Sequence, residues 1–277
     1  MPKRIVVVGG GAAGTAAALE ARRTDRTAQI TLINREKLPE YSRCGLPYVI
    51  SKVIPEPENV IIQDEAALRQ MMRIDLRLHT EVTDVDMKNR VVMAESLDSG
   101  EKFSFPFDSL VLALGAKPGS APVQGLDGKK NVFKLRTMHD VEEISKMALP
   151  GKTVAILGAS LIGMELAEAL SHLKLKVTII HRSPETLSTL LDPDMSQMIR
   201  VEAEKEGVKF ALGTTIQEIG GSDRVEWVKT AAGDTFQVDL MAVATGTPPE
   251  TALAVKIGAK TGKNEGILVD DHMCVGV

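Results

Sequence analysis

The sequence predicts an α/β protein built from two Rossmann-like βαβ units that belong to separate domains. A short β-branched run, Arg4 to Val8, leads directly into glycines and an alanine-rich segment. The same order of strand, glycine turn, helix and strand restarts at Lys152. In addition, DLMAVATG at 239–246 closely repeats DSLVLALG at 108–115. A pattern that restarts in this way indicates a second domain of the same type rather than one enlarged sheet.

Length and composition favour a two-domain globular protein. The 277 residues exceed one small domain, and 44% apolar and 25% charged residues are ordinary for a soluble fold. A formal net charge of −4 and 3% aromatic residues argue against a nucleic-acid partner. The apolar runs are too short for a bilayer span, which argues against a membrane protein. Two distant cysteines, Cys44 and Cys274, are typical of the reducing cytoplasm.

The first domain is predicted to begin with a βαβ unit. The run from Arg4 to Val8 has the pattern of a buried parallel strand. The alanine-rich segment Ala12–Arg23 predicts a helix, and AQITLI, ending at Ile33, predicts a second strand. Three further elements are expected in chain order: a short amphipathic helix at Asp64–Met72, a β-hairpin at 81–95 that turns at Lys88–Asn89, and a buried strand at Phe107–Gly115.

The second domain repeats this pattern after a crossover at 116–130 that is rich in Gly and Pro. A strand at Lys152–Leu157, a helix beginning at Leu161 and a strand ending at Ile180 form its βαβ unit. We therefore expect three segments: a first domain over 1–115, an inserted domain over 116–244, and a return to the first domain over 245–277.

The glycines after the first strand form a G-x-G-x-x-G pattern, which is typical of a dinucleotide-binding turn. Gly9 permits the tight turn, Gly11 lets a pyrophosphate approach the backbone, and Gly14 lets the helix pack on the strand. The second strand, where an acid usually binds the adenosine ribose, ends in Asn34, whose amide also bonds hydroxyl groups. The alternative is a glycine-rich turn without a ligand. The residues expected to bind cofactor here are Gly9, Gly11, Ala12, Ala13, Gly14, Asn34 and Arg35.

A second phosphate cradle is expected at Gly158–Gly163, where serine replaces the middle glycine. Ser160 is small, so it hinders a phosphate only slightly. The next strand ends in His181-Arg182 and not in a carboxylate, a pair that favours the 2′-phosphate of NADPH or admits both nicotinamide cofactors. Alternatively, Arg182 is a solvated surface residue. The residues expected to bind cofactor here are Gly158, Ser160, Leu161, Ile162, Gly163, His181 and Arg182, with Gly115 and Gly246 at the ends of the two exit strands.

Cys44 is the candidate reactive residue. It lies in PEYSRCGLPYVIS after the second strand, and Pro47 suits the first turn of a helix. A helix N-terminus favours the nucleophilic thiolate, and Arg43 beside it would assist. The usual role of a lone cysteine is that of an inert buried thiol. Here the loop after the second strand of such a unit lies beside the bound cofactor, so we interpret Cys44 as reactive.

With these motifs the sequence resembles the pyridine nucleotide–disulfide oxidoreductases, and within them the single-cysteine branch that contains coenzyme A disulfide reductase, NADH oxidase and persulfide reductases. The matching pieces are VVVGGGAAG, CGLPYVI, LVLALGAKP, LRTMHDVEEI, AILGASLIGMELAE, TIIHRS, LLDPDM, AVATGTPP and ILVDDHM. They occur in family order and cover essentially the whole chain. Members with two redox cysteines carry them five residues apart, and Cys44 has no such partner.

The resemblance implies an FAD domain with an inserted NAD(P)H domain. Electrons would pass from NADPH or NADH to FAD and then through Cys44 to a small disulfide or persulfide. The cysteine loop and HRS look most like coenzyme A disulfide reductases. The resemblance adds Arg22 and Arg23 near the coenzyme A phosphates, Arg43 and Tyr48 near the substrate, and Glu165 near the nicotinamide amide. A solvated helix end is an equal alternative for the first two arginines, and a plain helix residue for Glu165.

Several features depart from the family pattern. Glu40 replaces an expected serine, Leu161 replaces the aromatic residue that gates the nicotinamide, and Asn34 replaces the ribose-binding acid. The pattern also continues beyond Val277 with a second FAD-contacting segment and a dimerisation domain, so we expect weakened FAD binding and leave the family's homodimer open. Two alternatives follow: an NADH oxidase that reduces oxygen through a Cys44 sulfenic acid, and a non-catalytic nucleotide-binding remnant.

The remaining candidates point to no further chemistry. His79, His139, His172 and His272 show no metal-ligand spacing, and surface or core roles account for them. Cys274 lies in a polar tail and is expected to be an incidental exposed thiol.

Overall fold

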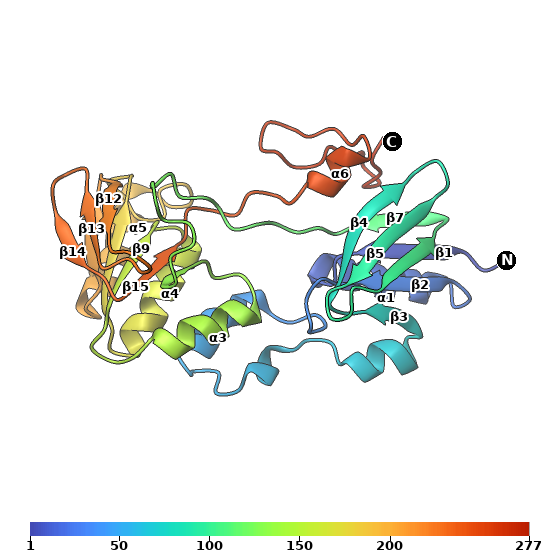
Figure 1. The fold of residues 1–277 in the computed structure, drawn as a ribbon, viewed down its shortest axis with the longest axis horizontal. Coiled ribbons are helices and arrows are strands. Elements are labelled where there is room, and N and C mark those ends of the chain that lie inside the picture. Colours follow the sequence, from blue (N-terminus) through green and yellow to red (C-terminus); the bar gives the residue numbers. More distant parts are fainter. Residues whose placement is uncertain (277) are drawn as a thin grey trace. The chain divides into compact units, whose positions relative to one another are not determined.

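The computed structural model describes residues 1–276, which separate into two compact units. Unit 1 comprises residues 1–42, 60–117 and the segment from Pro248 onward, and unit 2 comprises residues 43–59 and 118–247. Both are α/β units built on a parallel sheet, as the sequence predicts (Figure 1). Residues 43–59, which hold Cys44, cluster with unit 2, although they follow the second strand of unit 1.

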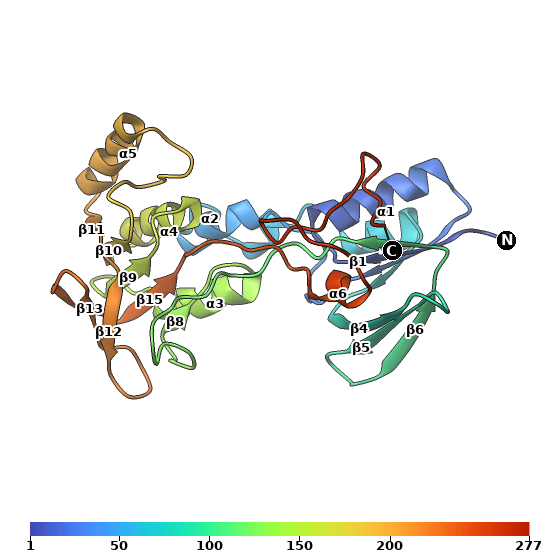
Figure 2. The ribbon, with the colours of Figure 1, turned by 90° about the horizontal axis from the view of Figure 1, so that it is seen from above.

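Unit 1 combines a parallel sheet, an antiparallel sheet and two helices. Its elements are β1 (Arg4–Val8), α1 (Ala12–Thr24), β2 (Gln29–Ile33), β3 (Ile74–Arg77), β4 (Thr80–Asp86), β5 (Val91–Ser96), β6 (Lys102–Pro106), β7 (Ser109–Leu112) and α6 (Ala252–Lys256). The parallel sheet has the order β3-β2-β1-β7. Helix α1 covers one face of it, and the antiparallel sheet β4-β5-β6 covers the other (Figure 2).

Alternate residues of β1 face the two cores of unit 1. Val7 packs in one core with Ala18 of α1, whereas Val6 and Val8 pack in the other with Val92 of β5. Successive side chains of a strand point to opposite faces of the sheet. A strand covered on both faces therefore reads as a continuous apolar run, which is why β1 could be recognised in the sequence.

Three sequence predictions in unit 1 meet different outcomes. The hairpin that turns at Lys88–Asn89 is confirmed by the antiparallel pair β4 and β5. The short helix expected at Asp64–Met72 includes a π-helical turn at Ala67–Met71. The strand expected to be buried at Phe107–Gly115 is β7, and its four residues are only half-buried because β7 lies at the edge of the sheet.

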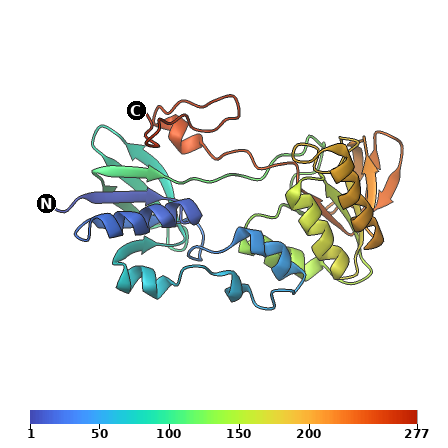
Figure 3. The same cartoon turned by 180° about the vertical axis from the view of Figure 1, so that it is seen from behind.

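Unit 2 holds the second parallel sheet, in the order β11-β10-β9-β15-β8, and a small antiparallel sheet, β12-β13-β14. Helix α2 packs on α3 and α4 (Figure 3). The elements are α2 (Leu46–Ile50), β8 (Val132–Phe133), α3 (Met138–Met147), β9 (Thr153–Leu157), α4 (Leu161–His172), β10 (Lys176–His181), α5 (Pro193–Lys205), β11 (Lys209–Leu212), β12 (Ile216–Gly220), β13 (Trp227–Thr230), β14 (Thr235–Gln237) and β15 (Leu240–Val243).

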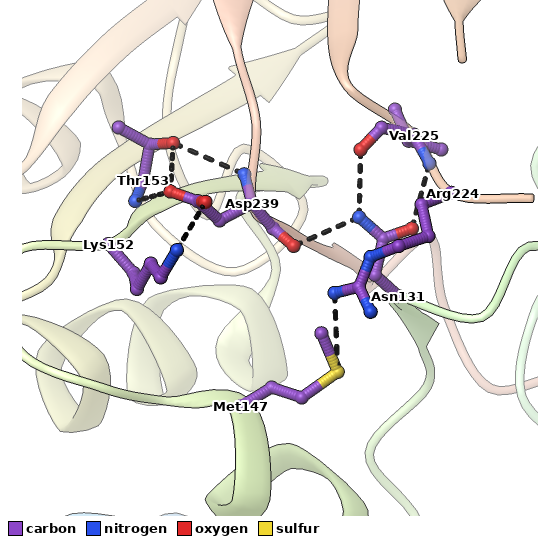
Figure 4. Close-up of polar contacts among 7 residues, drawn as sticks. All are labelled: Asn131, Met147, Lys152, Thr153, Arg224, Val225 and Asp239. Carbon is purple, nitrogen blue, oxygen red and sulfur yellow. Dashed lines mark hydrogen bonds and ion pairs between the residues drawn. The ribbon is translucent and has the colours of Figure 1, made fainter. Parts of the chain in front are cut away.

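At the amino edge of each parallel sheet, an aspartate accepts hydrogen bonds from the start of a neighbouring strand. Asp108, just before β7, accepts hydrogen bonds from the backbone nitrogen and the guanidinium of Arg4, both at 2.8 Å. Asp239, just before β15, accepts bonds of 2.9 Å from Lys152 Nζ and from the backbone nitrogen and Oγ1 of Thr153 (Figure 4). The two aspartates begin the repeated octapeptide, so the repeat includes the contact that ties β7 to β1 in one sheet and β15 to β9 in the other.

Replacing Asp239 by asparagine is expected to lower stability at neutral pH but not in acid. The bonds from Lys152, and then from Thr153, lower the pKa of Asp239 from 3.8 to about 2. Because the folded-state pKa is depressed, the stabilisation is present above about pH 4 and is lost as the pH falls towards about 2. The side chain is 40% exposed, so solvent screens these contacts and we expect a loss of about 1 kcal/mol or less. Urea unfolding of both proteins between pH 7 and pH 2 measures the difference, and a difference that is as large at pH 2 as at pH 7 would contradict this role.

Candidate active site

The turn between β1 and α1, the first cradle, has three positions where only glycine fits. Gly9 has a φ of +107°, and a Cβ on it would lie 2.1 Å from the carbonyl oxygen of Ala113. A Cβ on Gly14 would lie 1.8 Å from the carbonyl oxygen of Gly9. A Cβ on Gly10 would lie 2.7 Å from the side chain of Asn34. Sequence reasoning missed Gly10, whose only signal is its place in a run of three glycines.

Gly11 differs from its neighbours, because a Cβ placed on it would have no atom within 4 Å from any described residue other than those next to it in the chain. Gly11 is the N-cap of α1, and the first turn, which begins with the exposed Ala12 and Ala13, contains no acidic residue among residues 12–15. The backbone amides of a helix N-terminus attract anions. An open side at Gly11 and an uncharged helix start therefore fit the pyrophosphate of a dinucleotide such as FAD.

The turn between β9 and α4, the second cradle, repeats this geometry. A Cβ on Gly158, whose φ is +113°, would lie 2.3 Å from the carbonyl oxygen of Ala244. A Cβ on Gly163 would lie 2.0 Å from the carbonyl oxygen of Gly158. Ser160 is the N-cap of α4, and its hydroxyl donates to the same Ala244 oxygen at 3.0 Å, which holds it against the end of β15. The serine therefore takes the place of the middle glycine without closing the cradle, which fits a second dinucleotide such as NAD(P)H.

Asn34, at the end of β2, is only 7% exposed. Its Nδ2 donates to the carbonyl oxygen of Leu38 at 2.8 Å, and its backbone nitrogen donates to the carbonyl oxygen of Arg77 at 2.8 Å. The amide nitrogen is thus engaged by the loop that follows β2, so the side-chain oxygen is the atom suited to a ribose hydroxyl. The adjacent Arg35 is exposed and pairs with Glu81 at 3.5 Å.

The end of β10 carries the residues that the sequence connects with cofactor choice. His181 is half-buried, and this burial, followed by the charge of Arg182, lowers the pKa of His181. His181 is therefore neutral at neutral pH, and the exposed Arg182 carries the positive charge at this strand end. Ile180 pairs with Leu157, so the end of β10 reaches the same sheet edge as Gly158. A 2′-phosphate at this edge would meet a cation and no carboxylate from these two residues.

Cys44 lies in the 3₁₀ turn Arg43–Gly45 directly before α2, and its thiol is exposed. Pro47 occupies the first turn of α2, as the sequence predicts. Helix α2 has only five residues, so its dipole is weaker than that of a longer helix. Arg43 Nη1 donates to the carbonyl oxygen of Arg136 at 2.8 Å and ties the turn to the chain before α3. Cys44 is thus held at the surface of unit 2 by an anchored turn and a packed helix.

A small pocket beside α2 brings together two residues that the sequence singles out for different reasons. Tyr48 of α2, the proposed substrate residue, lines it with Glu165 of α4, the proposed nicotinamide residue. Glu168 and His172 complete its α4 side. Burial, followed by the charge of Glu168, raises the pKa of Glu165. The pocket therefore offers a phenol and two carboxylates on the same side of α2.

Arg22 and Arg23, which the sequence offers as a phosphate-binding pair, have different surroundings. Arg22 donates to five backbone carbonyl oxygens, at distances from 2.7 to 3.3 Å, which belong to Asp25, Arg26, Ala28, Met72 and Arg73. Arg23 is exposed and pairs with Glu20 at 3.3 Å. These contacts give Arg22 a structural role within unit 1, in which it joins the end of α1 to the chain before β3.

We expect Arg22→Ala to lower the free energy of unfolding by about 2–4 kcal/mol, because several carbonyl groups lose a charged donor. The matched variant Arg23→Ala should stay within about 0.5 kcal/mol of the unchanged protein. Urea unfolding midpoints measure both effects. Equal midpoints for all three proteins would contradict this structural role of Arg22.

The remaining residues that the sequence singles out lie at strand or helix ends. Gly115 and Gly246 follow β7 and β15 with φ values of +72° and +122°. Leu161 opens α4 and is 52% exposed, whereas Ile162 is half-buried. Among residues 1–276, no three His, Cys, Asp or Glu side chains are grouped as a metal site requires. None of the helices in this part of the chain has the length and apolar character needed to cross a bilayer.

Comparison with known proteins agrees with this geometry. A family model described as pyridine nucleotide-disulphide oxidoreductase matches residues 3–277. NADH oxidase of Methanocaldococcus jannaschii is 37% identical over 264 residues, which cover 94% of this chain and 58% of that protein. NAD(P)H coenzyme A polysulfide/persulfide reductase of Pyrococcus horikoshii is 31% identical over 279 residues, which cover 100% of this chain and 61% of that protein. The solved structure of an NAD-dependent persulfide reductase from A. fulgidus matches with a TM-score of 0.94 and 31% identity, covering 99% of this chain and 51% of that one. The chain thus spans between 51% and 61% of the length of these relatives.

Proposed function

Because the chain belongs to the pyridine nucleotide–disulphide oxidoreductase family, we propose that it is an NAD(P)H-dependent flavin oxidoreductase that reduces a small disulfide or persulfide through Cys44. One observation carries the proposal: the exposed Cys44 thiol directly precedes α2, and α2 packs on α4, the helix that begins at the second cradle. The names of two persulfide-reducing relatives support the same chemistry. Coenzyme A disulfide is the substrate that we favour within this class.

The two cradles are assigned to the two cofactors. We assign FAD to the first cradle, with Gly11 facing the pyrophosphate and Asn34 the ribose, and NAD(P)H to the second. Glu165 is assigned to the nicotinamide amide, whose N–H groups can donate to its carboxylate, and burial raises the pKa of this carboxyl group. When bound, the flavin supplies the transfer of two electrons from the nicotinamide to sulfur.

Cys44 is the proposed nucleophile. Its thiolate attacks one sulfur of the substrate disulfide, the S–S bond breaks, and the other half leaves as a thiolate that takes a proton from water. This forms a mixed disulfide between Cys44 and the retained half. Two electrons that originate from NAD(P)H then reduce the mixed disulfide, which restores the Cys44 thiolate and releases the second half, protonated, as a thiol. An exposed thiol suits this step because a bulky substrate must approach it along the S–S axis.

His181→Glu is expected to shift cofactor preference from NADPH towards NADH by roughly tenfold, since the new charge would repel a 2′-phosphate at close range. Arg182→Ala should weaken NADPH binding and leave NADH binding unchanged, because Arg182 supplies the positive charge at this strand end. Fluorescence titration of both nucleotides with each variant gives the ratio of dissociation constants. If that ratio is the same in all three proteins, the end of β10 does not recognise the phosphate.

An oxidase that reduces oxygen through a Cys44 sulfenic acid is the second candidate function. The name of the relative at 37% identity favours it. Both candidates use the same cysteine and the same cofactors, so only the electron acceptor separates them.

Turnover of the acceptors tests the proposal. The chain is supplied with FAD, and NADPH or NADH oxidation is followed without oxygen in the presence of coenzyme A disulfide or polysulfide, and separately with oxygen alone. We expect two thiols to be released for each NAD(P)H consumed with the disulfide. Turnover with oxygen but not with either sulfur acceptor would overturn the reductase in favour of the oxidase, and a protein that neither binds FAD nor turns over would contradict both.

A further inference from the structure

A cavity of about 520 Å³ lies in unit 2 at the sheet edge opposite the second cradle. Its lining includes the first residues of β9, β10 and β11, whereas Gly158 follows the last residue of β9. Gly158 lies five residues beyond Thr153, the first residue of β9, so the two positions are separated by about 16 Å along the strand. The volume falls in the range of about 300–1,000 Å³ that is usual for small-molecule sites. The cavity is therefore separate from the dinucleotide cradle and large enough for a ligand of its own.

The cavity combines an aromatic side chain with a basic rim. Phe236 is half-buried and lines the cavity, whereas the side chains of Val154 and Val177 beneath it are almost fully buried. The side chains of Lys174, Lys176 and Lys209 are exposed at the rim. The rim also contains a single carboxylate, that of Glu206, so its formal charge is positive.

The three rim lysines form no ion pair with any carboxylate of residues 1–276. Lys152, at the same edge of the sheet, differs from them, because its ammonium group is held by Asp239 at 2.9 Å (Figure 4). Lys174 also adopts a φ of +67°, a left-handed conformation that usually favours glycine or asparagine after a helix. The chain thus keeps a lysine at a position where local geometry favours a smaller residue.

Attraction to helix ends accounts for part of this arrangement. Lys174 and Lys209 follow the carboxyl ends of α4 and α5, where a cation is favoured by the helix dipole. Lys176 lies in β10, so a helix dipole does not explain the position of its positive charge. Nor does a helix dipole explain why the three lysines share a cavity with an aromatic side chain, that of Phe236.

We propose that this cavity binds a small organic polyanion that carries an apolar or aromatic group, as a nucleoside polyphosphate does. The anionic part would lie among Lys174, Lys176 and Lys209, and the apolar or aromatic part against Phe236. The site would bind its ligand while both cradles are filled, because it lies at the other edge of the sheet. Its existence does not depend on which electron acceptor the protein reduces.

Calorimetric titration of the full chain tests the proposal with FAD and NADP⁺ present at saturation. ATP is the probe, and tripolyphosphate and adenosine represent its anionic and aromatic parts. We expect ATP to bind with one-to-one stoichiometry and more tightly than either part alone. The triple substitution Lys174→Gln, Lys176→Gln and Lys209→Gln should weaken ATP binding by about tenfold or more.

A matched triple variant controls for net charge. Lys3→Gln, Lys88→Gln and Lys102→Gln remove the same charge from exposed positions of unit 1, and ATP affinity should stay within about twofold of that of the unchanged protein. Phe236→Leu should weaken ATP and leave tripolyphosphate unchanged. The proposal is overturned if both triple variants weaken ATP equally, if the rim variant does not weaken it, or if tripolyphosphate binds as tightly as ATP.

Discussion

Serine in place of Cys44 is expected to abolish reduction of coenzyme A disulfide and polysulfide, with a fall in kcat of about 1,000-fold or more. A hydroxyl is not ionised near neutral pH and forms no mixed disulfide, so the covalent step of the proposed mechanism has no nucleophile. Cys44 is exposed, and replacing sulfur by oxygen there removes little buried surface. Stability and NADPH affinity should therefore be unchanged, and steady-state turnover with titration of NADPH measures the two properties separately.

Cys274 provides the matched control, because it is the second exposed thiol. Its backbone nitrogen donates to Asp270 Oδ1 at 2.9 Å, and its sulfur lies 3.8 Å from the carbonyl oxygen of His272. Cys274→Ser should leave turnover unchanged. Labelling with limiting iodoacetamide near neutral pH, read by peptide mass spectrometry, should modify Cys44 first when cofactor is present. Faster labelling of Cys274, together with full activity of Cys44→Ser, would rule out the single-cysteine mechanism.

The two cradles could be predicted from the sequence because their requirements are local. A Cβ added to Gly9 would lie 2.1 Å from a backbone carbonyl oxygen, so only glycine fits there. The same holds at Gly14, where an added Cβ would also collide with a carbonyl oxygen. The same two contacts recur at Gly158 and Gly163. Where a single residue type satisfies the backbone, the sequence carries the geometry directly.

The surroundings of Cys44 could not be predicted in this way, because its contacts come from distant parts of the chain. Arg43 bonds a carbonyl oxygen 93 residues away, and α2 packs on α3 and α4. Arg22 gives the same lesson. The sequence does not distinguish a basic residue that faces solvent at a helix end from one, such as Arg22, that donates to the carbonyl groups of two loops. The lysine-rimmed cavity likewise depends on strand starts that the sequence separates widely.

Gly14→Val is expected to lower stability and Gly11→Val to weaken FAD binding, although both glycines belong to one motif. A Cβ on Gly14 would lie 1.8 Å from a backbone oxygen, so valine there should cost about 3 kcal/mol of stability or more. Apart from its chain neighbours, a Cβ on Gly11 would meet no atom of the described residues within 4 Å, and the Gly11 φ of −81° suits any residue. Valine at this N-cap should therefore cost only about 1 kcal/mol.

The effect of Gly11→Val should instead fall on FAD. Its side chain would occupy the space in front of α1 that we assign to the pyrophosphate. FAD affinity should therefore fall by about 100-fold. This corresponds to about 3 kcal/mol, the contribution of one hydrogen bond to a charged group. Urea unfolding and FAD titration by flavin fluorescence, on the same preparations, separate stability from binding. Gly14→Val should unfold at lower urea, whereas Gly11→Val should unfold near the midpoint of the unchanged protein and yet bind FAD weakly. Unchanged FAD affinity in Gly11→Val would show that the open side of Gly11 does not face the cofactor, and the assignment of FAD to the first cradle would then be wrong.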